Sequence, residues 1–154
     1  GLEDLLFITG AESDPGLDAA IRQSEPEAGL RTVPTLNSYV GDLSDQHVFR
    51  KNERPYLLLT CGRWEHYHAS TDTPDILNMS KIEAMANYVI TLTELLSDSI
   101  LDGPFNGNET LSTEIYFLEK NVMPTLRSLG MSLPLTTRAD IDRLVTLLMS
   151  RFGL

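Results

Sequence analysis

An apolar run at residues 56–60 constrains the fold of this chain more than any other feature. The run reads YLLLT and lies between Pro55 and Gly62. A short run without charged residues, bounded by residues that break regular structure, is typical of a strand buried on both faces. We therefore predict that residues 56–60 form a central strand of a sheet.

Two more strands and a helix are predicted upstream of this run. Residues 5–8, LLFI, form a short apolar segment, and LRTVPTL follows at residues 30–36. Pro34 cannot donate a hydrogen bond to a neighbouring strand, which restricts the second segment to an edge or an end of the sheet. Between the two segments, Asp14 and Pro15 suit the N-cap and the first position of a helix.

A long amphipathic helix is predicted from about Ser80. Ser80 and Glu83 have the spacing of a capping box, in which the two side chains bond each other's backbone N–H groups. Apolar residues then recur at intervals of three and four, which is typical of a buried helical stripe. This predicted stripe comprises Ile82, Met85, Ala86, Val89, Leu92, Leu96 and Ile100.

The remainder of the chain is predicted to be helical. Turn-forming residues 102–108, DGPFNGN, mark the clearest boundary. Beyond it we expect Pro124 to kink or divide one helix, and Thr137 with Asp140 to cap the last. The expected buried stripes are Leu111, Ile115, Leu118, Val122, Leu126 and Leu129, then Ile141, Leu144, Val145, Leu148 and Phe152. These stripes either cover the sheet or pack on each other, and the alternative is that they form a homo-oligomer surface.

Strands that alternate with helices in the first hundred residues predict an α/β fold. The expected architecture is a partial three-layer α/β/α domain with a mostly parallel sheet over residues 1–101. A helical C-terminal appendix, residues 102–154, is expected to pack on it. In such sheets ligands bind at the carboxyl ends of the strands. The segment after residues 56–60 is therefore where we expect a functional site.

The composition argues against several classes of function. The net charge of −10 repels phosphate backbones and anionic membrane surfaces, so we expect no nucleic-acid partner. No apolar run reaches the roughly 20 residues of a membrane span, and we expect no membrane partner either. The one cysteine, Cys61, excludes an intrachain disulfide and a cysteine-cluster zinc site. We expect Cys61 to be a small buried apolar residue at the end of a strand.

Two of the three histidines, His66 and His68, lie in the expected site segment. Neutral imidazole is a favoured zinc ligand, and Asp72 is close enough in sequence to orient such a ring as a hydrogen-bond acceptor. The alternative is that both histidines are ordinary surface residues. We assign His66 to the rim and Trp64 to a pocket wall. Glu12 and Asp14 are assigned to loop solvation and helix capping.

The segment PYLLLTCGRWEHYHASTDTPDILNMSKIEAM resembles the C-terminal signature of the zinc-dependent aminopeptidase family, whose relatives include glutamate carboxypeptidase and glutaminyl cyclase. The matching residues are Tyr67, His68, Asp72, Thr73, Asp75, Leu77 and Asn78. Upstream, GDLSDQHVF is similar to the family's Ser-Asp-His-x-x-Phe segment through Ser44 and Asp45, although Gln46 replaces the family's histidine. The resemblance covers residues 2–101.

The resemblance implies a two-zinc site in which His68 holds one metal ion. It also implies that zinc-activated water attacks a peptide carbonyl, with a carboxylate as general base. The family's other ligands, a His-x-Asp pair, a bridging aspartate, a Glu-Glu pair and a further acid, have no counterparts in this chain. The residues that the resemblance places near the metal or in the substrate pocket are Ser44, Asp45, Trp64, Tyr67, Asp72 and Thr73.

We therefore expect the C-terminal part of a zinc exopeptidase that acts on peptides, most simply an aminopeptidase, and expect the isolated chain to be inactive. Carboxypeptidase and cyclase activities stay open, as does the compartment, since family members are often exported. Gln46 favours an alternative, a non-catalytic peptidase-like interaction module that has lost the metal. A third alternative is a mononuclear zinc hydrolase that uses only residues of this chain.

Overall fold

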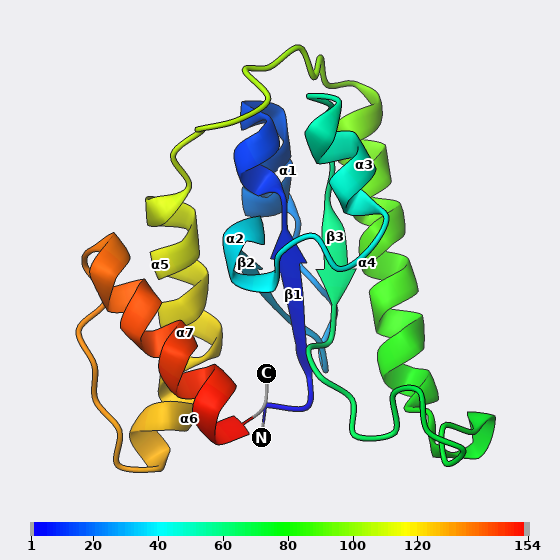
Figure 1. The fold of residues 1–154 in the computed structure, drawn as a ribbon, viewed down its shortest axis with the longest axis vertical. Helices are drawn as coiled ribbons and strands as arrows, with labels where there is room; N and C mark the ends of the chain where they lie inside the picture. The colour runs from blue at the N-terminus through cyan, green and yellow to red at the C-terminus, as the bar shows by residue number, and fades with distance from the viewer. Residues whose placement is uncertain (1, 153–154) are drawn as a thin grey trace.

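The computed structural model describes the backbone of residues 2–152 and the side chains of residues 2–150. Within this range three strands form one sheet in the order β2-β1-β3 (Figure 1). Strand β1 (Leu5–Thr9) pairs parallel with β2 (Arg31–Thr35) and antiparallel with β3 (Leu58–Thr60). The predicted α/β class is confirmed, but the sheet is mixed and not mostly parallel.

Helices account for most of the regular structure. Asp14 caps the first long helix as predicted, because its Oδ1 accepts a 2.7 Å hydrogen bond from the backbone N–H of Gly16. The helical elements are η1 (Ala11–Ser13), α1 (Pro15–Gln23), α2 (Asn37–Val40), α3 (Gln46–Lys51), η2 (Pro74–Ile76), α4 (Met79–Ser97), α5 (Leu111–Asn121), α6 (Met123–Ser128) and α7 (Arg138–Phe152).

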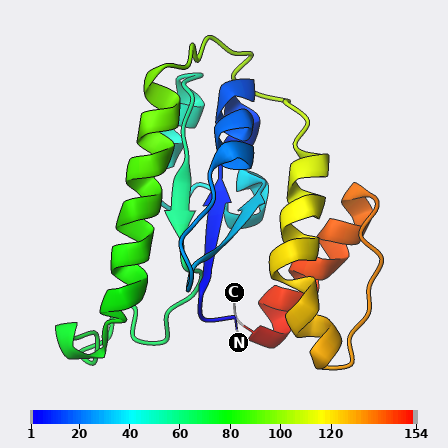
Figure 2. The same ribbon diagram turned by 180° about the vertical axis from the view of Figure 1, so that it is seen from behind.

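The side chains of β1 alternate between two hydrophobic cores, because successive residues of a strand point to opposite faces. Leu6 and Ile8 pack with residues of α1 and α4, whereas Leu5 packs with Val33 of β2 and residues of α5, α6 and α7. Figures 1 and 2 show α1 with α4 and α5 to α7 as separate groups of helices about the sheet. The central strand of this sheet is therefore β1.

The prediction that residues 56–60 form a central strand is wrong. The observed strand β3 begins at Leu58, lies at an edge of the sheet and has half-buried side chains. Leu57 and Leu59 pack against the core beneath α4, while Tyr56 is buried outside the strand. An apolar run shows that its residues need partial burial, but it does not determine whether a strand lies in the middle or at an edge.

Two predictions about α4 are also wrong in detail. The N-cap is Asn78, whose Oδ1 accepts a hydrogen bond from the backbone N–H of Lys81 at 3.0 Å, so Ser80 lies inside the helix. The fully buried face consists of Ala84, Tyr88 and Leu92. Of the predicted stripe, Met85 and Leu96 are half-buried, whereas Ile82, Ala86, Val89 and Ile100 are exposed.

The C-terminal helices mostly agree with those predicted from the sequence. Pro124 divides the predicted helix, since α5 ends at Asn121 and α6 begins at Met123. Asp140 accepts a 2.8 Å hydrogen bond from the backbone N–H of Thr137 and caps α7 as predicted. Leu129 is exposed, against expectation, and the side chain of Phe152 lies outside the described residues.

Within residues 2–152 no helix is long and apolar enough to cross a membrane.

Candidate functional site

The loop that carries His66 and His68, residues 61–78, leaves the carboxyl end of β3. Because β3 runs antiparallel to β1, Thr60 pairs with Phe7 and Leu58 pairs with Thr9. The loop therefore starts at the edge of the sheet where β1 and β2 begin (Figure 1). The prediction that the loop lies with the carboxyl ends of the parallel strands is wrong, since that rule requires β3 to be parallel.

Local contacts hold Trp64 and His66 in the loop. The indole Nε1 of Trp64 donates to Oδ1 of Asp72 at 3.2 Å, and the ring meets that of His66 edge to face with 4.8 Å between centroids. His66 Nδ1 is hydrogen-bonded to Thr71 Oγ1 at 2.8 Å. Asp72 thus orients Trp64, whereas we had predicted that it would orient a histidine ring.

His68 is the loop histidine without such an anchor. Its backbone has φ 59°, in the left-handed region, and its ring stacks on that of Tyr67 with centroids 4.0 Å apart. Both residues are exposed, and within the described part of the chain no hydrogen bond reaches either ring nitrogen of His68. Both nitrogens are therefore open to a ligand from solvent.

The described part of the chain shows no cluster of metal ligands. Among the described residues no three histidine, cysteine, aspartate or glutamate side chains lie close enough together to bind one metal ion. Zinc requires three or four protein ligands. The described residues therefore do not bring together a complete set of zinc ligands.

Ser44 and Asp45 lie apart from the loop in every described interaction. The carbonyl oxygen of Ser44 is hydrogen-bonded to His47 Nδ1 at 2.9 Å, and Asp45 is the N-cap of α3 without a side-chain capping bond. Gln46, in the place of the family's histidine, is buried and donates from Nε2 to the Gly41 carbonyl at 2.9 Å. Thr73 immediately precedes η2 and remains beside Asp72 in the loop. No contact among the described residues joins Ser44 or Asp45 to residues 64–73.

The carboxyl ends of β1 and β2 hold a polar cluster that the sequence did not reveal, and it includes Glu12, which we had assigned to loop solvation. Oε1 of Glu12 accepts a 2.7 Å hydrogen bond from the backbone N–H of Asn37, and Thr9 Oγ1 donates to Asn37 Oδ1 at 3.3 Å. The second carboxylate oxygen of Glu12 is buried without a partner in the described structure. Burial raises the pKa of Glu12. The signal available in the sequence was the position of these residues directly after two predicted strands.

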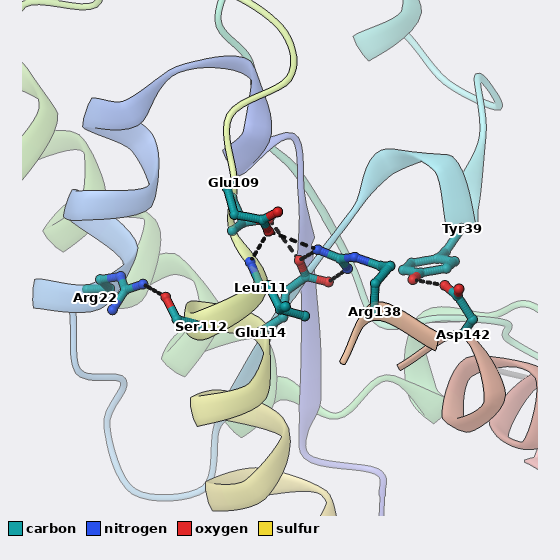
Figure 3. Close-up of polar contacts among 9 residues, drawn as sticks. Arg22, Tyr39, Glu109, Leu111, Ser112, Glu114, Arg138 and Asp142 are labelled. Atoms are coloured by element: carbon teal, nitrogen blue, oxygen red, sulfur yellow. Dashed lines mark hydrogen bonds and ion pairs between the residues drawn. The ribbon is translucent and has the colours of Figure 1, made fainter. Parts of the chain in front are cut away.

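A second buried acid, Glu114 of α5, pairs with Arg138 of α7 (Figure 3). Glu114 is 1% exposed and receives two hydrogen bonds from the guanidinium group, both 2.7 Å long. The hydroxyl of Thr110 donates a third at 2.7 Å. Beside this pair, burial and a hydrogen bond to Asp142 raise the pKa of Tyr39 to about 12. Both carboxylate oxygens of Glu114 are thus bonded within the protein, and the pair links α7 to α5.

Comparisons with models of known protein families, with curated proteins and with solved structures found no match for this chain. Its function must therefore be argued from its own residues.

An apolar cavity of about 90 Å³ lies between the sheet and helices α2, α5 and α7. Its walls include Phe7, Val33, Tyr39, Leu118, Ile141 and Leu148. Ligand pockets usually measure roughly 300–1,000 Å³, so this cavity is too small for a peptide. It also contains none of the predicted site residues. We take the exposed loop around His68, where the sequence signature lies, as the candidate functional site.

Proposed function

We propose that this chain is the C-terminal part of a zinc-dependent exopeptidase, an aminopeptidase, to which it contributes one zinc ligand, His68. The observation that carries the proposal is the contrast between the two loop histidines. The signature places the metal ligand at His68, and this imidazole is the one whose nitrogens are free. In the complete enzyme zinc would supply the activated water, while this chain would position one ligand and line part of the peptide-binding pocket.

Hydrogen bonds within the loop support this role because they order the backbone around His68. The backbone N–H of Tyr67 donates to the Trp64 carbonyl at 3.0 Å, and the N–H of Ala69 donates to the His66 carbonyl at 2.8 Å. These turns flank His68 on both sides in sequence. A ligand on a locally ordered turn loses less conformational entropy when it binds a metal than one on a disordered segment.

The residues around His68 include side chains that can contact a peptide. Tyr67 stacks on the imidazole, and Trp64 with Asp72 and Thr73 belongs to the same loop. We propose that Ser44 and Asp45 belong to the substrate pocket of the complete domain. We also propose that the sheet, which has helices against both faces of β1, is one part of a larger three-layer α/β/α domain.

Isothermal titration calorimetry of the 154-residue chain with zinc at neutral pH tests the proposal. We expect weak binding that His68→Ala abolishes and that His66→Ala preserves, since His66 already bonds Thr71. We also expect no hydrolysis of an aminoacyl-anilide. Binding that is indifferent to His68→Ala would contradict the proposal. Sub-micromolar binding that depends on His68 would instead favour a mononuclear zinc hydrolase.

One observation favours the second candidate, a peptidase-like interaction module without metal. Gln46 replaces the family's histidine and is buried with a structural hydrogen bond to Gly41, so this position is not available to a substrate. The coding sequence upstream of Gly1 separates the two candidates. His-x-Asp and Glu-Glu motifs there would support the exopeptidase, whereas substitution of these motifs would support the module.

A further inference from the structure

The segment between helices α4 and α5 contains the only Asn-Gly pair of the chain. Asn106 and Gly107 belong to residues 102–108, DGPFNGN, and the structure has no helix or strand in residues 98–110. Figures 1 and 2 show this segment crossing from α4 to α5 past one end of α1. An Asn-Gly pair is typical of a turn, and asparagine is among the thermolabile residues. The pair is therefore open to covalent change as well as to turning.

Hydrogen bonds fix the segment on either side of this pair. On one side the backbone N–H of Gly103 donates to Oδ2 of Asp14 at 2.9 Å. On the other side Nδ2 of Asn108 donates to the carbonyl oxygen of Glu12 at 2.9 Å. The segment is thus held against the residues that follow β1, and the Asn-Gly pair lies between its two anchors.

The Asn-Gly pair itself is not held in this way. Both residues are exposed, and within the described residues no hydrogen bond involves the side chain of Asn106 or the backbone N–H of Gly107. Gly107 has φ 71°, and a Cβ atom at this position would meet no described atom within 4 Å. Glycine also has the widest backbone freedom of any residue. The nitrogen of Gly107 can therefore approach the side-chain carbonyl carbon of Asn106.

We propose that Asn106 is a site of spontaneous deamidation. The backbone nitrogen of Gly107 attacks Cγ of Asn106 and loses its proton, the bond from Cγ to the side-chain nitrogen breaks, and that nitrogen leaves as ammonia. The product is a succinimide ring. Water then opens either C–N bond of the ring, which leaves an aspartate or an isoaspartate whose backbone passes through the β-carbon. Water is the only co-reactant, and each event adds one negative charge to a chain of net charge −10.

Asp102 and Gly103 provide a comparison within the same segment. An aspartate before a glycine can close the same ring with loss of water, and Asp102 is also exposed. The attacking nitrogen would be that of Gly103, whose N–H already donates to Asp14. This hydrogen bond must break before the ring can form. The fold should therefore protect Asp102 and leave Asn106 reactive.

Other asparagines lack this combination of exposure and a free neighbouring nitrogen without a side chain. Asn52 and Asn78 are also exposed, but they are followed by Glu53 and Met79, whose side chains hinder the attack. Asn108 is half-buried and donates to two backbone carbonyls, at 2.9 and 2.7 Å. The fold therefore singles out Asn106.

Ageing of the 154-residue chain at mildly alkaline pH, followed by peptide mass spectrometry and ion-exchange chromatography, tests the proposal. We expect Asn106 to convert to aspartate and isoaspartate, and the chain to become more acidic. Gly107→Ala should slow the conversion several-fold, because a side chain then obstructs the nitrogen. Gly130→Ala is the matched control and should leave the rate unchanged, since Gly130 has φ 76° and equally open surroundings. Circular dichroism checks that both variants are folded.

The same ageing in urea separates the effect of the fold from that of the sequence. We expect Asn106 to react at a similar rate in the folded and the unfolded chain, whereas Asp102 should react more slowly in the folded chain. Equal protection of both residues by folding would overturn the proposal, as would a conversion that Gly130→Ala slows as much as Gly107→Ala. The inference is independent of the proposed function, because the reaction requires neither zinc nor His68.

Discussion

The two ends of strand β1 use polar side chains in opposite ways. At its beginning lies the loop of residues 61–78, where the exposed rings of His68 and Tyr67 stack on each other. Past its end, Glu12 and Asp14 are tied to backbone N–H groups, and beyond them Glu114 is buried against Arg138. Buried polar groups must be satisfied within the protein. The buried side chains thus hold the fold together, whereas the exposed ring at the other end is free to bind a ligand.

Arg138→Met should cause the largest effect at the buried end. It leaves the carboxylate of Glu114, which is 1% exposed, without its counter-charge. Removal of one partner from a buried ion pair is costly, and we expect the free energy of unfolding to fall by about 3 kcal/mol. Urea denaturation followed by circular dichroism measures it. The double variant Glu114→Gln with Arg138→Met should lose less, because no buried charge remains. Equal losses would show that Arg138 acts through packing and not through charge.

Asp14→Ala should have the next largest effect. Asp14 caps α1 through Gly16 and also accepts a 2.9 Å hydrogen bond from the backbone N–H of Gly103, which ties the segment before α5 to the start of α1. We expect a loss of about 1–2 kcal/mol in the same denaturation experiment. Asp45→Ala is the matched control, since Asp45 is the N-cap of α3 without a side-chain bond. A similar loss in both variants would contradict the distinct role of Asp14.

Glu12 should make stability depend on pH. Burial raises the pKa of Glu12 above its ordinary value of 4.5, so the folded chain retains a proton that the unfolded chain has already released. The stabilisation that protonated Glu12 provides is complete below pH 4.5 and is lost as the pH rises through the pKa of the folded state. Glu12→Gln should therefore gain stability relative to the wild type between about pH 4 and pH 7. Parallel pH profiles for the two proteins would show that Glu12 is ionised in both states.

Features that depend on neighbouring residues could be predicted from the sequence. Four features of this kind follow from local chemistry: the N-cap at Asp14, the edge strand that contains Pro34, the division of the helix at Pro124, and the capping box of Thr137 and Asp140. Each depends on which backbone groups a side chain can bond or block within a few residues.

Features that depend on distant pairing could not be predicted in this way. The direction of β3 depends on its pairing with β1, about fifty residues away in sequence. Because this pairing is antiparallel, the loop of residues 61–78 lies at the edge of the sheet opposite to the predicted one. The pair Glu114 with Arg138 links two helices across 24 residues. The sequence also did not show which face of α4 is exposed. Apolar residues occur around most of this helix, so their spacing does not indicate which of them pack against the sheet.

His68→Ala should have the smallest effect on stability and is the sharpest test of the comparison. Its side chain is exposed and stacks on the Tyr67 ring, so the free energy of unfolding should change by less than about 0.5 kcal/mol. His66→Ala should cost more, since it removes the hydrogen bond to Thr71 that orders the loop. Zinc binding should show the reverse order, with loss in His68→Ala and retention in His66→Ala. A marked loss of stability in His68→Ala would mean that this end of β1 is also structural, and the free imidazole would no longer single out His68 as a ligand.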